Sequence, residues 1–426
     1  MRSQRTIERQ CFAAALLVSF LTLPSAVLSQ GEVPQEETPS EFLRDGDRVV
    51  FVGDALFDHS RQLGYLETAL TSRAHGKKVI FRNIAWSGDN VRGRARAVFD
   101  APAKGYDKLL TQIRAEKPTV VVFSYGFASS FDGKTGLKRF VDDYNRLTGA
   151  VVKGGVRAAY VTPLVHEKLA PPLPDPGPHN AQLSLYVAAI AKKAEGSKSP
   201  LVDLFSTHAG DGVRLTHNGI HVTPFGGWRL ADRFASSLGE KGSTWSVEVD
   251  VARGEAKPNG TTLREFHVDN DSVHFHALDD QLPPPPMPSD GAPKEAGSLT
   301  ARVVTVRGLS AGEYTLTIDD QTVATGNSSE WSKGVTLRDS PEAKQAEKLR
   351  ERVVRKNFLH LCRFRPQNNT YLFLFRKHEQ GNLAKEIPDF DPLIAAEETR
   401  IDQLKKPKSR CYRLRKIDSS KEGGSK

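Results

Sequence analysis

RVVFVGDAL, residues 48–56, is the stretch of this sequence that decides the fold. Its four consecutive apolar residues, Val49–Val52, predict a strand that is buried on both faces, as strands are in a parallel sheet. The segment Gly53-Asp54-Ala55-Leu56 follows at the carboxyl end of that strand. In parallel sheets the loops at the carboxyl ends of the strands surround the ligand site, so candidate functional residues are sought there.

Four more strand-like runs follow, and helix-like stretches separate them. The runs are Val79–Phe81, Thr119–Tyr125, Arg157–Thr162 and Leu201–Leu204, and the helix-like stretches are 62–74, 104–116, 135–152, 179–195 and Pro224–Leu238. Strands connected through helices make right-handed crossovers and form a parallel sheet with helices on both faces. We therefore predict an α/β domain with a parallel sheet sandwiched by helices over residues 45–240.

Beyond Leu238 the pattern changes to short strands and turns. Strand-like alternation appears at Trp245–Val251, Glu265–Val268, Val273–Ala277, Ala301–Val306 and Tyr314–Ile318, with a turn signal at Pro258-Asn259-Gly260. The prolines Pro283–Pro286 and Pro288 predict an extended loop in this region. We predict a small β module with a proline-rich loop over residues 241–335.

Residues 336–426 predict a helical, basic C-terminal extension. Ser340 is a favoured helix cap, and Pro341 is a favoured first helical residue. Ala346, Leu349, Val353 and Leu361 then form one apolar stripe, a second helix is predicted over Asp391–Leu404, and the segment Arg363–Lys377 between them is aromatic and basic. The last ten residues are polar, which predicts a frayed end.

The N-terminus has the features of a secretory signal peptide. Three arginines precede the apolar run Cys11–Leu28, and small residues place a cleavage site near Ser29–Gln30. An uncleaved membrane anchor is the alternative, but the run is short for a span and is interrupted by Pro24. We predict a signal peptide over residues 1–29, a flexible leader over 30–44, and a secreted or periplasmic protein with no stable membrane span after cleavage.

The formal net charge of +9 belongs to the C-terminal extension. After residue 340 there are 21 lysines and arginines against 12 aspartates and glutamates, a difference of nine, so the upstream sequence is neutral on balance. The aromatic and basic composition of residues 363–378 is typical of nucleic-acid binding, but export argues against a nucleic-acid partner. We predict an arm that packs on the core, with arginines that form salt bridges or contact anionic polysaccharide.

Cysteines and strand histidines raise the question of metal binding. Cys362 and Cys411 can pair in an oxidising compartment or stay as free thiols, and neither lies in a metal-ligand spacing. His274 and His276 share one face of a predicted strand, with His267 nearby. No carboxylate or cysteine completes a set of metal ligands with them. We therefore predict solvated strand histidines, no metal site and no cofactor.

Four loop segments carry the candidate chemistry: Gly53–Leu56, Asn83–Asp89, Tyr125–Ser129 and Thr216–Pro224. In order and spacing they resemble the four sequence blocks of the SGNH/GDSL hydrolase family of lipases and esterases. The resemblance covers residues 45–238 and implies the flavodoxin-like parallel sheet of that family. Residues 300–405 resemble the C-terminal extension of a secreted bacterial branch of the family.

The resemblance also implies roles for single residues. The family uses a serine nucleophile, a glycine N–H and an asparagine as oxyanion donors, and a histidine base oriented by an aspartate three residues before it. The corresponding positions here are Ala55, Gly88, Ala128, His221 and Asn218. Alanine cannot form an acyl-enzyme, and an amide cannot stabilise an imidazolium as a carboxylate does. The catalytic centre is therefore expected to be largely lost.

Other residues of these loops leave two alternatives open. Ser60, Ser87, Ser129 and Ser130 are candidates for a displaced nucleophile, and Asp54, Asp58, His59, Asp89 and His221 are candidates for surrounding a hydrolytic water or a metal. Loop serines and aspartates more often complete turns or cap helices. Asp54, Asp89 and Ser129 are predicted to bind a ligand in the cleft.

These residues together predict a secreted protein of carbohydrate-esterase-like ancestry that binds a ligand or acts as a scaffold without turnover. The expected ligand is a carbohydrate or an ester-bearing small molecule. The alternative is an active esterase on ester-substituted carbohydrate, acting through a displaced serine or a water activated by His221. A third hypothesis is a structural envelope or matrix protein. Nothing in the sequence sets the oligomeric state.

Overall fold

The computed structural model describes residues 42–207, 213–290, 292 and 301–417. The predicted signal peptide and residues 30–41 of the predicted leader lie outside these ranges. Leu43 was assigned to the flexible leader, but its side chain is fully buried in the core of the α/β domain. The folded domain therefore begins before residue 45. No helix in the described part of the chain combines the length and apolar character needed to cross a membrane.

Five parallel strands form the central sheet, in the order β2-β1-β3-β4-β5. They are β1 (Arg48–Gly53), β2 (Ile80–Asn83), β3 (Val120–Ser124), β4 (Arg157–Val161) and β5 (Leu201–Val202). This is the flavodoxin-like order, so the predicted fold class is confirmed. Alternate residues of β1 enter two separate cores, with Val49 and Phe51 on one face and Val50 and Val52 on the other.

Helices cover both faces of this sheet. The elements are α1 (Ala55–Leu63), α2 (Tyr65–Arg73), η1 (Arg94–Ala97), α3 (Lys104–Ala115), α4 (Phe127–Ser130), α5 (Gly133–Val152), α6 (Gly177–Gly196) and α7 (Pro224–Ser237). Apolar residues of α1, α2 and α7 fill one core, and those of α3, α5 and α6 fill the other. The single helix predicted over 62–74 is two helices that meet at Gly64, and the first of them starts directly after Asp54.

Two further sheets form the β module, in the orders β13-β10-β6-β7 and β12-β11-β14-β9-β8. The strands are β6 (Trp245–Asp250), β7 (Glu255–Asn259), β8 (Thr261–Asp269), β9 (Ser272–Asp279), β10 (Arg302–Arg307), β11 (Glu313–Ile318), β12 (Gln321–Asn327), β13 (Val335–Leu337) and β14 (Arg410–Lys416), with helix α8 (Ser328–Lys333) before β13. Pro258, predicted to lie in a turn, is in β7. The position is tolerated because β7 is an edge strand, where a missing N–H breaks no ladder.

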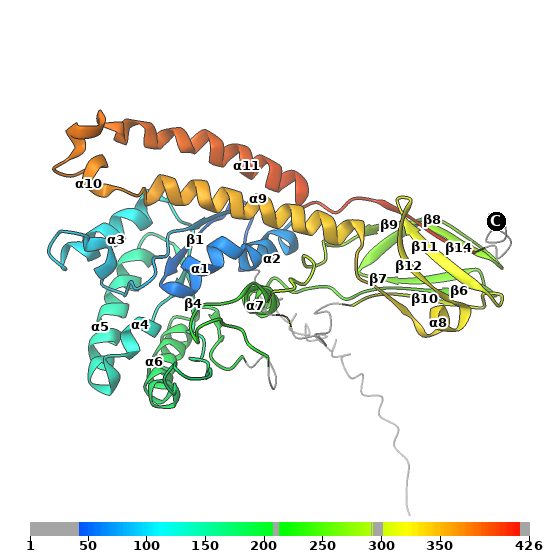
Figure 1. Cartoon of the computed structure of the whole chain (residues 1–426), viewed down its shortest axis with the longest axis horizontal. Coiled ribbons are helices and arrows are strands. Elements are labelled where there is room, and N and C mark those ends of the chain that lie inside the picture. Colours follow the sequence, from blue (N-terminus) through cyan, green and yellow to red (C-terminus); the bar gives the residue numbers. More distant parts are fainter. Residues whose placement is uncertain (1–41, 208–212, 291, 293–300, 418–426) are drawn as a thin grey trace, which may run out of the picture. The chain divides into compact units, whose positions relative to one another are not determined.

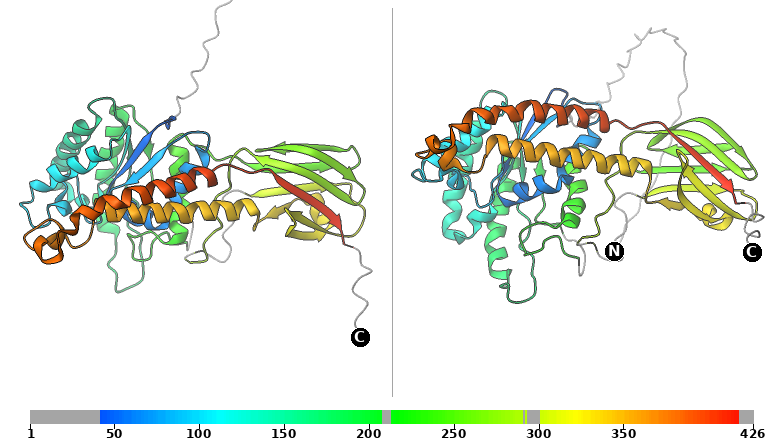
Figure 2. Two further views of the ribbon diagram at one scale, coloured as in Figure 1. Left: turned by 90° about the horizontal axis from the view of Figure 1, so that it is seen from above. Right: turned by 45° about the horizontal axis from the view of Figure 1, so that its top comes forward.

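The C-terminal extension is a pair of long helices that lie side by side (Figures 1 and 2). It contains α9 (Pro341–Phe364), α10 (Asn369–Leu372), η2 (Lys377–Gln380), η3 (Leu383–Asp389) and α11 (Phe390–Leu404). The Ser340 hydroxyl caps α9 by accepting from the Ala343 N–H at 3.3 Å, as predicted. We call α9–α11 the helical arm.

After the arm the chain returns to the β module. Strand β14 is inserted between β11 and β9, antiparallel to both. The extension predicted as helical over 336–426 therefore contains a strand that was not predicted, at residues 410–416. Apolar residues at every second position, Tyr412 and Leu414, point into the core of the module, while Cys411 and Arg413 are only half-buried.

A buried polar network anchors α9 to the α/β domain. Lys356 is 2% exposed, and its Nζ donates to the Glu67 carboxylate and to the carbonyl oxygen of Phe81, the latter at 2.8 Å. The Asn357 side chain donates to the second oxygen of Glu67 at 2.8 Å. Burial lowers the pKa of the Lys356 ammonium, and the charge of Glu67 opposes that shift. The ammonium of Lys356 and the carboxylate of Glu67 are both buried, so each needs the other as a partner, and their contact holds α9 on the α/β domain.

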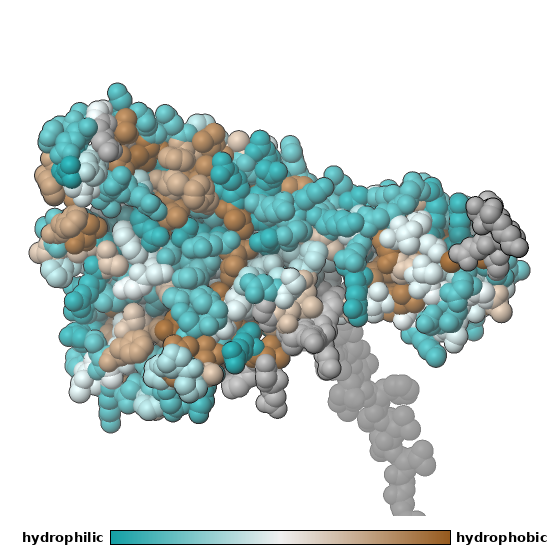
Figure 3. Space-filling model, in the orientation of Figure 1, coloured by the Kyte–Doolittle hydropathy of each residue, from teal (hydrophilic) through white to brown (hydrophobic). Residues whose placement is uncertain are grey.

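Hydrophilic and hydrophobic residues are interspersed on the face of the molecule shown in Figure 3. Salt bridges contribute to the hydrophilic surface of the arm, among them Arg363 with Asp391 at 3.0 Å. The prediction that arginines of the extension form salt bridges is confirmed at this pair.

Candidate functional site: the loops at the carboxyl ends of the strands

The loop before α7 places His221 at the start of that helix. Its ends are joined by a backbone hydrogen bond from the His217 N–H to the His221 carbonyl oxygen at 3.0 Å. Gly219 has a φ of 88°, and a side chain there would meet the ring of His166 at 3.0 Å, so the turn requires glycine. The Thr223 hydroxyl then caps α7 by accepting from the Gly226 N–H at 2.9 Å.

Asn218 contacts the His221 ring through its amide nitrogen, a donor where a triad aspartate offers an acceptor. The Asn218 carbonyl oxygen accepts from the backbone N–H groups of Ile220 and His221, at 3.3 and 2.9 Å. Because those donors fix the carbonyl oxygen, the amide nitrogen faces the ring and lies 2.8 Å from His221 Nδ1. An amide NH₂ only donates, so Nδ1 is the acceptor. The neutral ring therefore carries its proton on Nε2.

This tautomer is opposite to that of a general base. In a Ser-His-Asp triad the acid accepts from Nδ1–H, which leaves the Nε2 lone pair free to take the serine proton. Burial lowers the pKa of the His221 ring, and the neighbouring His217 lowers it further, so the ring stays neutral at pH 7. The Nε2 of His221 thus carries an N–H donor and has no free lone pair with which to act as a base.

The position of the family nucleophile, Ala55, is the first residue of α1. One helical turn later comes His59, whose ring stacks on His221 with centroids 4.0 Å apart. Burial lowers the pKa of His59, and the adjacent His221 adds to this effect. Ala128 and Ser129, in the third block, are both half-buried in α4. Within the described ranges no serine hydroxyl hydrogen bonds to the ring of His221.

The second block keeps the glycine turn that the family pattern requires. The Asp89 N–H donates to the Trp86 carbonyl oxygen at 3.0 Å, and Gly88 between them has a φ of 77° and is exposed. The Ser87 hydroxyl donates to the Asp58 carboxylate at 2.7 Å, so this serine holds the loop in place and does not contact a histidine that could activate it. Gly88, at the position that the resemblance assigns to an oxyanion donor, is therefore accessible.

The helical arm contributes a side chain to this part of the cleft. The Arg365 guanidinium lies 4.7 Å from the ring centroid of Trp86 and 3.4 Å from the Asp58 carboxylate. Asp58 also pairs with Arg61 at 2.6 Å. Asp58 is thus neutralised by two arginines and does not surround a metal with His59.

Asp89 has a different role from the predicted one. Its carboxylate is fully buried and pairs with the buried Arg96 at 2.7 Å, and the Ala95 N–H donates to it at 3.1 Å. Asp54 is also buried, at 4% exposure. The prediction that Asp89 binds a ligand is corrected: it holds η1 against the second block.

Asp54 carries an unusual carboxyl group. Burial is the largest cause that raises its pKa to about 7, and the charge of Asp89 adds to it, while the backbone N–H groups of Leu56 and Ala128 oppose the shift. One carboxyl oxygen, Oδ2, has no hydrogen-bond partner among the described residues. The neutral form is therefore favoured in the folded protein.

We expect Asp54→Asn to change how stability depends on pH. A folded pKa of about 7 against an ordinary value of 3.8 gives stability that is fully present below pH 4 and is lost as the pH rises through about 7. Relative to the native chain, the variant should gain on the order of 2 to 4 kcal/mol between pH 5 and pH 8. Urea unfolding at both values measures this, and an equal pH dependence in the two proteins would contradict it.

A second polar cluster lies beside the His221 loop. The Ser130 hydroxyl contacts His179 Nε2 at 2.8 Å, and His179 Nδ1 lies 3.1 Å from His166 Nδ1. Phe131, 62% exposed, stacks on His179 with ring centroids 4.0 Å apart. Ser130 was among the predicted candidates for a nucleophile, whereas His166 and His179 were not predicted. The available signal was the position of His166, just after the fourth strand, where the loops of a parallel sheet gather.

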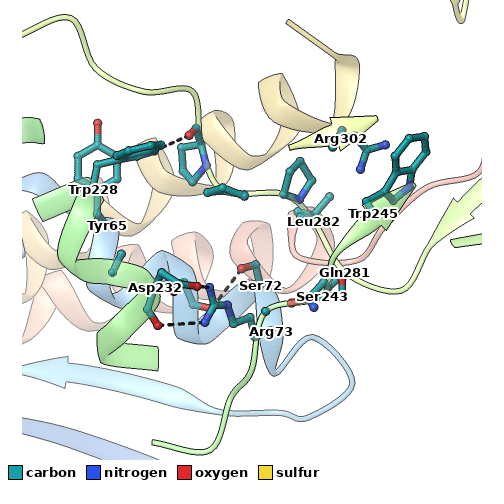
Figure 4. A pocket seen from close by; sticks show the side chains of 16 residues that line it. Tyr65, Ser72, Arg73, Trp228, Asp232, Ser243, Trp245, Gln281, Leu282 and Arg302 are labelled. Carbon is teal, nitrogen blue, oxygen red and sulfur yellow. Dashed lines mark hydrogen bonds and ion pairs between the residues drawn. The ribbon is translucent and has the colours of Figure 1, made fainter. Parts of the chain in front are cut away.

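Two of the cavities that adjoin the α/β domain differ greatly in volume. The smaller, about 40 Å³, lies beside the proline-rich loop and is lined by Tyr65, Trp228, Trp245 and Arg302, among others (Figure 4). The Trp228 N–H donates to the Pro285 carbonyl oxygen at 2.9 Å there, which marks a packed junction. The larger, about 950 Å³, lies between the α/β domain and the helical arm, and Trp86 and Arg365 line it.

Comparison with solved structures agrees with this architecture. A gut microbial diltiazem-metabolizing enzyme has 17% sequence identity, and the match covers 88% of this chain and 98% of that chain with a TM-score of 0.68. An acetylxylan esterase from Geobacillus stearothermophilus has 18% identity over 46% of this chain and 96% of its own, with a TM-score of 0.36. A GDSL-like lipase from Parabacteroides merdae has 15% identity over 47% and 98%, with a TM-score of 0.38.

The first of these matches carries the fold assignment, and its coverage extends it to the β module and the arm. No protein-family model and no curated protein sequence matches the chain. The parallel sheet order, the four loop segments at the carboxyl ends of the strands and the structural match lead to one conclusion: the chain has an SGNH/GDSL hydrolase-like α/β fold.

Proposed function

We propose that this chain is an exported protein of ester-hydrolase ancestry that binds a carbohydrate or an ester-bearing small molecule without turning it over. The observation that carries the proposal is the hydrogen bond from Asn218 to His221 Nδ1, at 2.8 Å. It places the proton on Nε2, where a general base needs a lone pair. Ala55 removes the nucleophile as well. A site that lacks both groups has neither step of acyl transfer.

The cavity between the α/β domain and the arm supports the binding role. Its volume of about 950 Å³ is in the range of ligand sites. Its wall includes Trp86, from the second block, and the half-buried Arg365, whose guanidinium lies 4.7 Å from the Trp86 ring centroid. An aromatic ring beside a guanidinium donor suits a polar organic molecule rich in acceptor oxygens. The fold match to a diltiazem-metabolizing enzyme also favours a small organic ligand.

One experiment tests both halves of the proposal. The purified chain is assayed for hydrolysis of an activated acetyl ester, and its melting temperature is measured with a panel of plain and acetylated oligosaccharides. We expect hydrolysis no faster than that of His221→Ala, and a rise in melting temperature with at least one sugar, by linkage. Trp86→Ala should remove that rise, while Phe358→Ala, exposed on α9 outside the cavity, should keep it.

Turnover that His221→Ala abolishes would overturn the non-catalytic assignment. The absence of any shift across the panel would overturn the binding assignment.

An active esterase remains the second candidate because of one contact. Ser130 is the serine whose hydroxyl meets a histidine ring, and His166 backs that ring as an acid would in a triad. However, Ser130 has no exposed surface, and its hydroxyl also donates to the Phe127 carbonyl oxygen at 2.7 Å. Hydrolysis lost in Ser130→Ala but kept in His221→Ala would support this route.

A further inference from the structure

Three strands of the β module bring together side chains with the chemistry of metal ligands. His274 and His276 alternate on β9 with the buried Val273 and Phe275, so both histidines lie on the outer face of the sheet. Strand β14 pairs with β9 so that Cys411 lies directly opposite His276. The predicted absence of a cysteine near these histidines is therefore wrong. Cys411 comes from a position 137 residues further along the chain than His274.

The distances among these three residues fit a single ion. One ligand atom each from His274, His276 and Cys411 lies within 4.8 Å of the others, and the trio is the one group in the described part of the chain that meets this condition. His274 Nε2 and Cys411 Sγ are 3.3 Å apart. Zinc bonds of about 2.0 Å to nitrogen and 2.3 Å to sulfur in a tetrahedron separate those atoms by about 3.5 Å. All three residues are half-buried, which leaves a path for the ion.

We propose that His274, His276 and Cys411 bind one zinc ion on the outer face of the β module. Two imidazoles and one thiolate are ligands that zinc prefers, and a water completes the four positions. On binding, Cys411 releases its thiol proton to solvent and the sulfur lone pair bonds to the ion. Cys362 and Cys411, the cysteines of the described ranges, are free thiols in this structure, so a Cys362–Cys411 disulfide is not present and Cys411 is available.

The carboxylate of Glu265 lies next to His276. Glu265 lies in the bulge of β8 between Arg264 and His267, with a φ of 52° that is unusual for a side-chain-bearing residue. Its Oε2 is 3.5 Å from His276 Nε2. The bulge turns this carboxylate toward the histidines, where it balances the charge of the ion and accepts a hydrogen bond from the bound water. A regular strand would not direct it there.

The position of the site gives the ion a structural consequence. Strand β14 is the last described strand, and its neighbours β9 and β11 precede it by more than ninety residues. Its pairing closes a long loop that contains the whole helical arm. An ion shared by β9 and β14 fixes that closure, so binding stabilises the folded module by mass action.

The test uses the full chain purified without a polyhistidine tag, stripped with a chelator and kept reduced. Titration with Co²⁺, which takes the place of zinc and absorbs visible light, should show one ion per chain and a thiolate-to-cobalt charge-transfer band that Zn²⁺ displaces. Cys411→Ser should abolish the band. His274→Ala and His276→Ala should weaken binding by more than about 100-fold, beyond the loss of an outer partner. These side chains point outward, so the variants retain the fold, which circular dichroism checks.

Two variants serve as matched controls. Cys362→Ser replaces the other free cysteine, on α9, and His378→Ala replaces an exposed histidine in η2; both should bind Co²⁺ like the native chain. Zn²⁺ should also raise the melting temperature of the native chain and of the controls, and not that of Cys411→Ser. No saturable binding, an unchanged band in Cys411→Ser, or a band lost in Cys362→Ser would each overturn the proposal.

Discussion

Ala55→Ser by itself should give almost no esterase, whereas Ala55→Ser with Asn218→Asp should hydrolyse an activated acetyl ester about 10³- to 10⁴-fold faster than the single variant. The serine alone meets a histidine whose Nε2 carries the proton, because the Asn218 amide donates to Nδ1. In Asn218→Asp the carboxylate accepts a hydrogen bond from Nδ1–H. The neutral His221 ring then carries its proton on Nδ1, and the Nε2 lone pair is free to take the serine proton. Asparagine in place of the triad acid costs about 10⁴ in rate elsewhere, for the same reason.

Initial rates with the activated ester measure this effect. Adding Ala128→Asn should raise the rate by a further factor of about 10² or more, since it restores one oxyanion donor. His221→Ala in the double variant is the control and should remove the gain. A large rate from Ala55→Ser alone would contradict the tautomer argument and show that the Asn218–His221 contact reorganises easily.

Glu67→Ala should destabilise the protein by about 3 to 5 kcal/mol, the largest effect on stability that we expect from a single substitution of a buried residue. Lys356, 2% exposed, would keep its charge in the interior with only the Phe81 carbonyl oxygen for a partner. Asn357 would lose its acceptor too. Breaking a buried pair costs more than the pair contributes, because the remaining charge stays desolvated.

Urea unfolding of the transition that includes the arm measures this loss. Glu67→Leu with Lys356→Met removes both charges and should recover most of the stability, as buried pairs replaced by apolar residues often do. Lys138→Met breaks an exposed ion pair with Asp142 on α5 and should leave the unfolding midpoint unchanged. A Glu67→Ala midpoint equal to that of Lys138→Met would show that α9 is held mainly by apolar contacts.

Much of the fold could be predicted from local patterns. Val49–Val52 predicts β1 because four apolar residues in a row fit a strand buried on both sides, and the five strands alternate with helices as expected. Ser340 and Pro341 locate the start of α9 to the residue, since capping depends only on neighbours within one turn. The candidate positions Ala55, Gly88 and His221 came from the resemblance of the four loop segments to the SGNH/GDSL family.

Strand β14 shows where such patterns stop being sufficient. Residues 410–416 are rich in arginine and follow a helix, and their strand conformation depends on ladders with β9 and β11 far upstream. Nothing within a few residues of Cys411 indicates that its Sγ will lie 3.3 Å from His274 Nε2. Arg365 likewise reaches Trp86 only because α9 crosses the α/β domain.

The sequence by itself determined the fold class, because periodicity, caps and loop order are properties of adjacent residues, and its resemblance to the SGNH/GDSL family gave the candidate site. Only the tertiary structure decided which ring nitrogen of His221 carries the proton and which histidines lie beside Cys411. The proton on His221 is set by which atom of Asn218 faces the ring, and that depends on two backbone donors in the folded turn. Cys411 lies beside His274 and His276 because strand pairing joins segments that are distant in the chain. That pairing depends on the free energy of the whole fold and not on the preferences of neighbouring residues.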